Sequence, residues 1–132
     1  MAYFTSWKTD DYLEDAKANP LVIVQLEHID AVRDLDRILA VKGVDSILIG
    51  PYDLSMSMGK PGQWHDPEVR ATFDEACRRI KAAGILLGVY AECDFDLWKR
   101  RGVDYIAVKN DTNAMLDGFR SAQDVARKGF AA

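Results

Sequence analysis

The chain has 132 residues, of which 48% are hydrophobic and 29% charged, and this balance is typical of a single globular domain. Its 17 Lys and Arg residues against 21 Asp and Glu residues give a net charge of −4 without a basic block, which argues against a nucleic-acid-binding protein. The N-terminus lacks a signal-peptide pattern and no segment approaches 18 consecutive apolar residues, so we expect a cytoplasmic protein without a membrane partner.

Apolar runs and helical patterns alternate along the first half of the chain. A helix is predicted from Thr9 through Lys17, and Pro20 marks its exit. The nearly continuous apolar runs 21–27 and 44–50 predict strands that are buried on both faces, as in a parallel sheet. Between them, Asp30 is placed to cap a helix with one apolar face, formed by Val32, Leu35, Ile38 and Leu39.

The second half repeats the pattern. Asp66-Pro67-Glu68 is a strong helix start, and this helix should end at Gly84. Strands are predicted over 85–91 and 103–108, with a short helix over 94–101 between them. Thr112 is placed to cap a last helix. The residues predicted to be buried on the two long helices are Val69, Phe73, Ala76, Cys77 and Ile80, then Met115, Phe119, Ala122 and Val125.

Strict alternation of strands and helices predicts parallel strands with right-handed crossovers. A doubly wound sheet and a (β/α)₈ barrel both use this order. Four strands make a thin doubly wound sheet, whereas they are half of a barrel, which takes about 250 residues. The residues alone leave both architectures open and favour the half barrel, and they mark no domain boundary, so we expect residues 1–132 to form a single domain of the α/β class.

Candidate chemistry lies where the first two strands end, because sites in both architectures form at the carboxyl ends of the strands. Glu27 closes the first apolar run, and Asp53 follows the second one after Gly50 and Pro51. Two carboxylates at neighbouring strand ends repel each other unless a cation lies between them, and oxygen ligands suit Mg²⁺, Mn²⁺ or Co²⁺. On spacing alone, the alternative is that both acids cap the helices that follow.

Other polar and small residues permit more than one interpretation. A glycine at position 50 lets the N–H groups of residues 50–53 approach an anion closely. Residues 54–62 are either a substrate loop or a plain connection with Met56 and Met58 in the core. Lys109 is more typical of a salt bridge than of a Schiff base. Cys77 and Cys93 have no CxxC partner and are expected to be reduced, and His28 and His65 are too far apart for a histidine metal site.

The motifs resemble those of the HpcH/HpaI aldolases, the class II pyruvate aldolases of the phosphoenolpyruvate/pyruvate superfamily. The resemblance rests on Val-Gln-Leu-Glu, Gly43-Val44-Asp45 and Ile-Gly-Pro-Tyr-Asp-Leu-Ser-Met-Ser-Met-Gly. It continues with Pro-Gly before Asp-Pro-Glu-Val, and with Val-Lys-Asn-Asp-Thr at the last strand. The match runs from about residue 9 to 125 and corresponds to the C-terminal half of the family's (β/α)₈ TIM barrel.

The resemblance implies that Glu27 and Asp53 are the protein ligands of a divalent metal that chelates pyruvate. It also implies that the backbone of Gly50, Pro51 and Tyr52 binds the pyruvate carboxylate. The implied reaction is the reversible aldol cleavage of 4-hydroxy-2-oxo acids to pyruvate and an aldehyde, as a metal-dependent carbon–carbon lyase.

The chain departs from the family in one respect, because the family's keto-polarising arginine and its histidine–acid pair belong to the N-terminal half. His28 is the one acid–base candidate here, and it follows Glu27 directly. We therefore expect a half-length aldolase with reduced activity. The alternatives are a non-catalytic half-barrel assembly module and an acyl-CoA lyase of the citrate-lyase β type. Exposed apolar surface should make the chain a homo-oligomer or the partner of a complementary half barrel.

Overall fold

The computed structural model describes residues 9–18 and 20–130, and every element named below lies in these ranges. The described part of the chain alternates helices and strands, as the sequence predicts, and each strand is shorter than its apolar run. The elements are α1 (Thr9–Ala18), β1 (Ile23–Leu26), α2 (Ile29–Arg33), α3 (Leu35–Leu39), β2 (Ser46–Ile49), α4 (Pro51–Ser57), α5 (Pro67–Ala82), β3 (Leu86–Tyr90), α6 (Phe95–Arg100), β4 (Tyr105–Ala107) and α7 (Asp111–Phe130).

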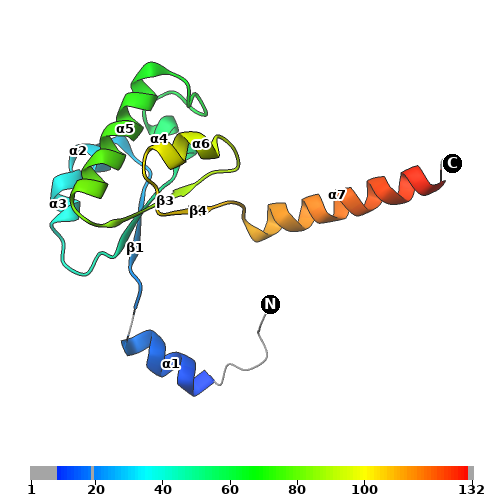
Figure 1. Cartoon of the computed structure of the whole chain (residues 1–132), viewed down its shortest axis with the longest axis horizontal. Coiled ribbons are helices and arrows are strands. Elements are labelled where there is room, and N and C mark those ends of the chain that lie inside the picture. Colours follow the sequence, from blue (N-terminus) through cyan, green and yellow to red (C-terminus); the bar gives the residue numbers. More distant parts are fainter. Residues whose placement is uncertain (1–8, 19, 131–132) are drawn as a thin grey trace.

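The four strands form one parallel sheet in the order β1-β2-β3-β4. A doubly wound sheet reverses its strand order at a switch point and carries helices on both faces. Here the order is sequential, and Figure 1 shows α2, α3, α5 and α6 together on one side of the sheet. This arrangement confirms the half barrel as the fold class.

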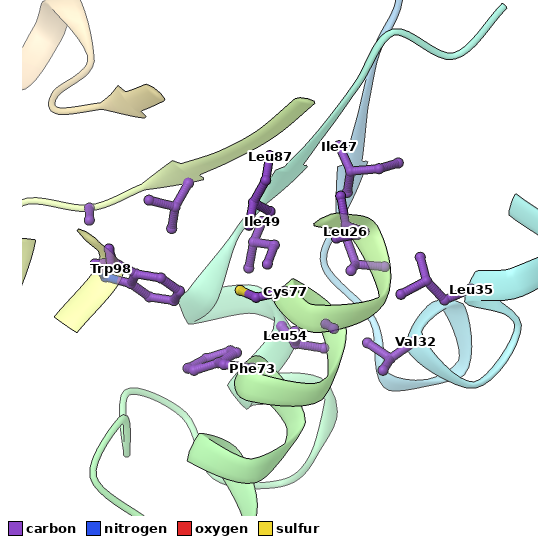
Figure 2. Packing of buried hydrophobic residues seen from close by; sticks show 14 of the residues in the cluster. Leu26, Val32, Leu35, Ile47, Ile49, Leu54, Phe73, Cys77, Leu87 and Trp98 are labelled. Carbon is purple, nitrogen blue, oxygen red and sulfur yellow. The ribbon is translucent and has the colours of Figure 1, made fainter. Parts of the chain in front are cut away.

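The hydrophobic core lies between the sheet and these helices. Alternate residues of the strands point toward α5, whose own apolar face points back at them (Figure 2). All five residues predicted to be buried on α5 are buried, and Asp66 caps the helix by accepting from the N–H groups of Glu68 and Val69. The strand residues of the core are Leu26, Ile47, Ile49, Leu87 and Val89.

The opposite face of the sheet is only partly filled. The Tyr105 ring lies across Gly88, where an added Cβ would come within 2.2 Å of Tyr105 Cζ. The Tyr105 hydroxyl is 2.8 Å from Ser46 Oγ, which in turn donates to the Leu86 carbonyl. Ile23 and Leu86, at the amino ends of their strands, remain exposed. In a complete barrel this face would be the interior.

Two local predictions need correction. The helix expected from Asp30 begins at Ile29, and its cap is His28, whose Nδ1 accepts from the Asp30 N–H at 3.2 Å. This helix also breaks at Asp34 into α2 and α3. The expected loop 54–62 is helical in its first part, because Pro51 takes the first position of α4, where its missing N–H is harmless. Of the two methionines in this segment, Met58 packs on the core and Met56 is exposed.

The last helix differs most from its prediction. It begins at Asp111, with the Asn110 side chain accepting from the Asn113 N–H, so Thr112 is not the cap. None of its described residues is buried in this chain, and Met115, Phe119 and Val125 are exposed. Figure 1 shows α7 extending away from the sheet. The amphipathic pattern is therefore real, but the chain itself does not cover the apolar face. Among the described helices, none is long and apolar enough to span a bilayer.

Both cysteines are free, as expected. Cys77 is buried in the core, and burial raises the pKa of its thiol to about 11, so it stays protonated near neutral pH. Cys93 is exposed.

A Gly-Val-Asp sequence precedes both β2 and β4 and holds the amino end of the sheet. Gly43 and Gly102 adopt positive φ values of 89° and 77°, which favour glycine. The carboxylate of Asp45 then accepts from the Val22 N–H at 2.8 Å, and that of Asp104 accepts from the Leu87 N–H at 2.8 Å. The repeated tripeptide therefore performs one task twice, which is to join each strand to its neighbour.

Replacing Asp104 by Ala should destabilise the sheet. The carboxylate also binds Lys81 Nζ at 2.6 Å, but Lys81 is partly exposed and water can solvate it in the variant. The main loss is the acceptor of the part-buried Leu87 N–H, at a cost of about 1–2 kcal/mol. The Leu87 N–H and then Lys81 lower the pKa of Asp104. A lowered pKa means that this stabilisation is complete above the unfolded value of about 3.9 and is lost as the pH falls from there through the lower pKa of the folded state.

Urea unfolding at pH 7 and below pH 4 measures the effect. The difference in midpoint between wild type and Asp104→Ala should shrink at the acidic pH. Asp124→Ala, on the exposed surface of α7, is the matched control and should leave the midpoint nearly unchanged. Equal midpoints for wild type and Asp104→Ala at pH 7 would contradict the role of Asp104.

Candidate functional site

The two predicted metal ligands lie at the same end of neighbouring strands. Glu27 directly follows β1, and Asp53 is in the first turn of α4, which begins right after β2. Because β1 and β2 pair in parallel, with Leu26 opposite Ile49, both acids belong to the carboxyl rim of the sheet. This is the rim where barrel enzymes place their sites.

The Glu27 side chain has a defined place at this rim. It lies over Gly50, where an added Cβ would be 2.6 Å from Glu27 Oε1 and 2.8 Å from Glu27 Cγ. Gly50 has an extended φ of −99°, so the position requires glycine for space and not for conformation. Gly50 thus leaves the carboxylate of Glu27 room to lie against the end of β2.

Gln25 is a functional candidate that the sequence analysis did not single out. Its Nε2 donates to Glu27 Oε1 at 3.0 Å. A hydrogen bond of this kind orients a carboxylate that binds a cation. The signal was available in the Gln-x-Glu spacing, because residues two apart on a strand point to the same face.

The turn at Gly50-Pro51-Tyr52 offers fewer donors than the sequence suggested. The Gly50 N–H donates to the Leu26 carbonyl at 3.2 Å, and Pro51 has no N–H. Tyr52 and Asp53 lie in the first turn of α4, where N–H groups have no acceptor within the helix. Any backbone binding of an anion here therefore depends on Tyr52 and Asp53, and Gly50 and Pro51 provide the shape of the turn.

Two buried or half-buried serines hold this turn in place. Ser55 Oγ donates to the Tyr52 carbonyl at 2.8 Å and accepts from the Gly62 N–H at 3.0 Å. Ser57 Oγ accepts from the Ile29 N–H at 2.9 Å, which ties α4 to the segment after β1. The Leu-Ser-x-Ser motif therefore fixes the position of Asp53 relative to the end of β1.

The remaining predicted site residues face elsewhere. His28 is exposed and caps α2, so its ring is engaged beside the helix that follows Glu27. Lys109 forms an ion pair with Asp117, and this hydrogen bond raises the pKa of Lys109. A raised pKa keeps the amine protonated, which fits the salt bridge and not a Schiff-base nucleophile.

The carboxyl end of β3 carries no predicted site residue. There, the Tyr90 hydroxyl donates to Glu92 Oε1 at 2.8 Å.

The donor set at the rim fits a divalent cation that binds few protein ligands. In the described part of the chain, no group of three or more His, Cys, Asp and Glu residues is placed to hold an ion. Mg²⁺ is usually bound through one or two carboxylates and keeps its other positions for water or substrate oxygens. Glu27 and Asp53 match that requirement, and the space above Gly50 lets the Glu27 carboxylate take part.

Comparisons with known proteins agree with the geometry. A family model described as HpcH/HpaI aldolase/citrate lyase matches residues 7–111. The chain is 37% identical to a hydroxypyruvate/pyruvate aldolase of Pseudomonas aeruginosa over 113 residues. This alignment covers 83% of the chain and 42% of that protein. The chain is also 36% identical to a 4-hydroxy-2-oxo-heptane-1,7-dioate aldolase of Shigella sonnei over 132 residues. This alignment covers 97% of the chain and 49% of that protein.

A solved structure shows the same fold. The crystal structure of an HpcH/HpaI aldolase/citrate lyase family protein from Burkholderia cenocepacia superposes with a TM-score of 0.74 at 32% identity. The match covers 90% of this chain and 47% of that one. The chain thus spans about half the length of the relatives that it matches.

Proposed function

Because the chain belongs to the HpcH/HpaI aldolase/citrate lyase family, we propose that it carries the metal and pyruvate half-site of a class II pyruvate aldolase. The observation that carries the proposal is the Glu27 carboxylate lying over Gly50, beside the helix that bears Asp53. The reaction is the reversible aldol cleavage of a 4-hydroxy-2-oxo acid. The C3–C4 bond breaks as the 4-hydroxyl loses its proton, and the products are an aldehyde and the enolate of pyruvate.

Glu27 and Asp53 hold the divalent cation in this proposal, with Mg²⁺, Mn²⁺ and Co²⁺ as the candidates. When bound, the cation supplies a Lewis acid that stabilises the negative charge of the enolate. Gln25 orients Glu27 through its hydrogen bond. The N–H groups of Tyr52 and Asp53 are the donors for the pyruvate carboxylate, and Ser55 fixes the turn that presents them.

Binding of oxalate, which resembles the enolate of pyruvate, tests the half-site directly. We expect calorimetry to show oxalate binding in the presence of Mg²⁺ or Mn²⁺ and much weaker binding when EDTA removes the metal. Pyruvate should bind in the same metal-dependent way and compete with oxalate. Equal oxalate affinity with and without metal would contradict the proposal.

We also expect the chain to associate with a partner, either a second copy or a complementary half barrel. Among the described residues, no strand pairs with the outer edge of β1 or β4. These edges, the exposed Ile23 and Leu86, and the apolar face of α7 all leave surface that association would bury. Light scattering of the purified chain should give a mass of at least a dimer. A well-folded monomer at low concentration would contradict this expectation.

A further inference from the structure

A pocket of about 370 Å³ opens between α4, α5 and α6, beyond the carboxyl ends of the strands. It begins at Pro51 and Tyr52, beside the proposed pyruvate turn. Its exposed lining is mostly apolar, and several aromatic side chains contribute to its walls. The lining residues that matter here are Tyr52, Trp64, Phe73, Leu97, Trp98 and Arg101. Figure 2 shows Phe73 and Trp98 at the end of the core that adjoins this pocket.

Arg101 is the one cation among the described residues that line this pocket. It is the C-cap residue that follows α6, and its side chain is only 5% exposed. Its Nε donates to Asp74 Oδ1 at 2.6 Å, and its guanidinium carbon is 4.7 Å from the centre of the Trp98 ring and 5.5 Å from that of Phe73. The Nη1 and Nη2 atoms are both buried, and neither has a hydrogen-bond partner among the described residues.

Buried donors without acceptors are unfavourable, and native proteins rarely keep them without a reason. The ring faces of Trp98 and Phe73 attract the positive charge, but they do not replace the oxygen acceptors that the two NH₂ groups require. The partner of Nε does not fill this need either, because Asp74 binds on the Nε side and is largely exposed. The two terminal nitrogens are therefore two unfilled donors side by side, an arrangement that suits the two oxygens of a carboxylate. Because both atoms are buried, a ligand in the pocket reaches them only when the side chains around them move aside.

We propose that the pocket binds a small organic acid, with its carboxylate on Nη1 and Nη2 of Arg101 and its apolar body against the aromatic walls. A monocarboxylate is the class that fits. The exposed carboxylates of Glu92 and Asp94 also line the pocket and would repel a ligand with several negative charges, such as a polyphosphate. The aromatic walls favour an apolar body over a strongly hydrated one.

The carboxylate can come from two sources. Because the pocket shares Pro51 and Tyr52 with the proposed pyruvate turn, the acid is either the far end of a substrate or a separate ligand. Both use the same chemistry at Arg101. The proposal does not depend on the metal at Glu27 and Asp53, so it can be tested without metal.

Titration of the metal-free chain with 3-phenylpropanoate, followed by calorimetry and by the indole resonance of Trp98, tests the site. The uncharged 3-phenylpropanamide has the same shape and should bind about tenfold or more weakly, because it lacks the charge-assisted hydrogen bonds. Arg101→Met should weaken 3-phenylpropanoate binding by a similar factor. Arg100→Met, at the exposed neighbouring arginine, should bind like wild type.

The proposal is overturned if 3-phenylpropanoate does not bind, if the amide binds as tightly as the acid, or if Arg101→Met keeps full affinity. The comparison of the acid with the amide uses the wild-type chain, so it still tests the proposal if Arg101→Met fails to fold. Repeating the titration with Mg²⁺ and a saturating 4-hydroxy-2-oxo acid that carries a second carboxylate identifies the source. Competition assigns the carboxylate to the far end of a substrate, and unchanged affinity assigns it to a separate ligand; both results support the site.

Discussion

Replacing Glu27 by Gln or Asp53 by Asn should remove most of the affinity of the chain for a divalent cation. Each variant keeps the size of the side chain but removes one of two negative charges, and both charges are needed to offset the loss of cation hydration. Mutation of residues that only orient metal ligands weakens binding about 10–100-fold, so removal of a ligand should have a larger effect. Calorimetry with Mn²⁺ measures this loss.

Two glycine variants test whether the position of the Glu27 carboxylate, and not only its charge, determines the affinity for Mn²⁺. Gly50→Ala places a Cβ within 2.6 Å of Glu27 Oε1, so Glu27 has to move and Mn²⁺ affinity should fall without any change of charge. Gly118→Ala is the matched control, because nothing lies within 4 Å of its added Cβ. Unchanged affinity in both Glu27→Gln and Asp53→Asn would show that the cation binds elsewhere.

The sequence predicts the buried part of this fold well, because burial leaves a clear pattern. The strands lie in nearly continuous apolar runs, and α5 has both a cap at Asp66 and five apolar residues at helical spacing. The sequential parallel sheet follows from the alternation of these elements. For the same reason, the positions of Glu27 and Asp53 in the sequence are enough to assign both acids to one rim, although their role as ligands stays a prediction.

What the sequence could not predict depends on contacts between segments or between chains. Cap preference favours Asp30, and only the path of the backbone makes His28 the cap. The apolar face of α7 has the pattern of a buried surface, but the pattern does not say which molecule covers it. Arg101 resembles an ordinary charged residue at the end of a helix, and it becomes buried only because Asp74, Phe73 and Trp98 meet around it.

The 132-residue chain should cleave 4-hydroxy-2-oxo acids far more slowly than a full-length relative, even when it binds metal and pyruvate normally. Cleavage also needs a positioned proton acceptor and a second cationic group on the keto oxygen, and by resemblance these belong to the half of the barrel that the chain does not match. Losing one preorganised stabiliser lowers the rate about 10²–10³-fold. Losing general acid–base catalysis lowers it by a further ~10²–10⁴-fold, although such factors do not simply multiply.

Release of pyruvate by the purified chain with Mn²⁺, measured beside the Pseudomonas aeruginosa hydroxypyruvate/pyruvate aldolase, tests this expectation. Slow decarboxylation of oxaloacetate should persist, because it needs a Lewis acid but no acid–base residue to begin. That residual activity should disappear in Glu27→Gln. If wild type shows no metal-dependent turnover at all, the chain is a non-catalytic assembly module. A turnover number within about tenfold of the full-length enzyme would refute the prediction. The missing groups would then lie in this chain, and His28 and Lys109 would be the first to replace, since each follows the carboxyl end of a strand by two residues.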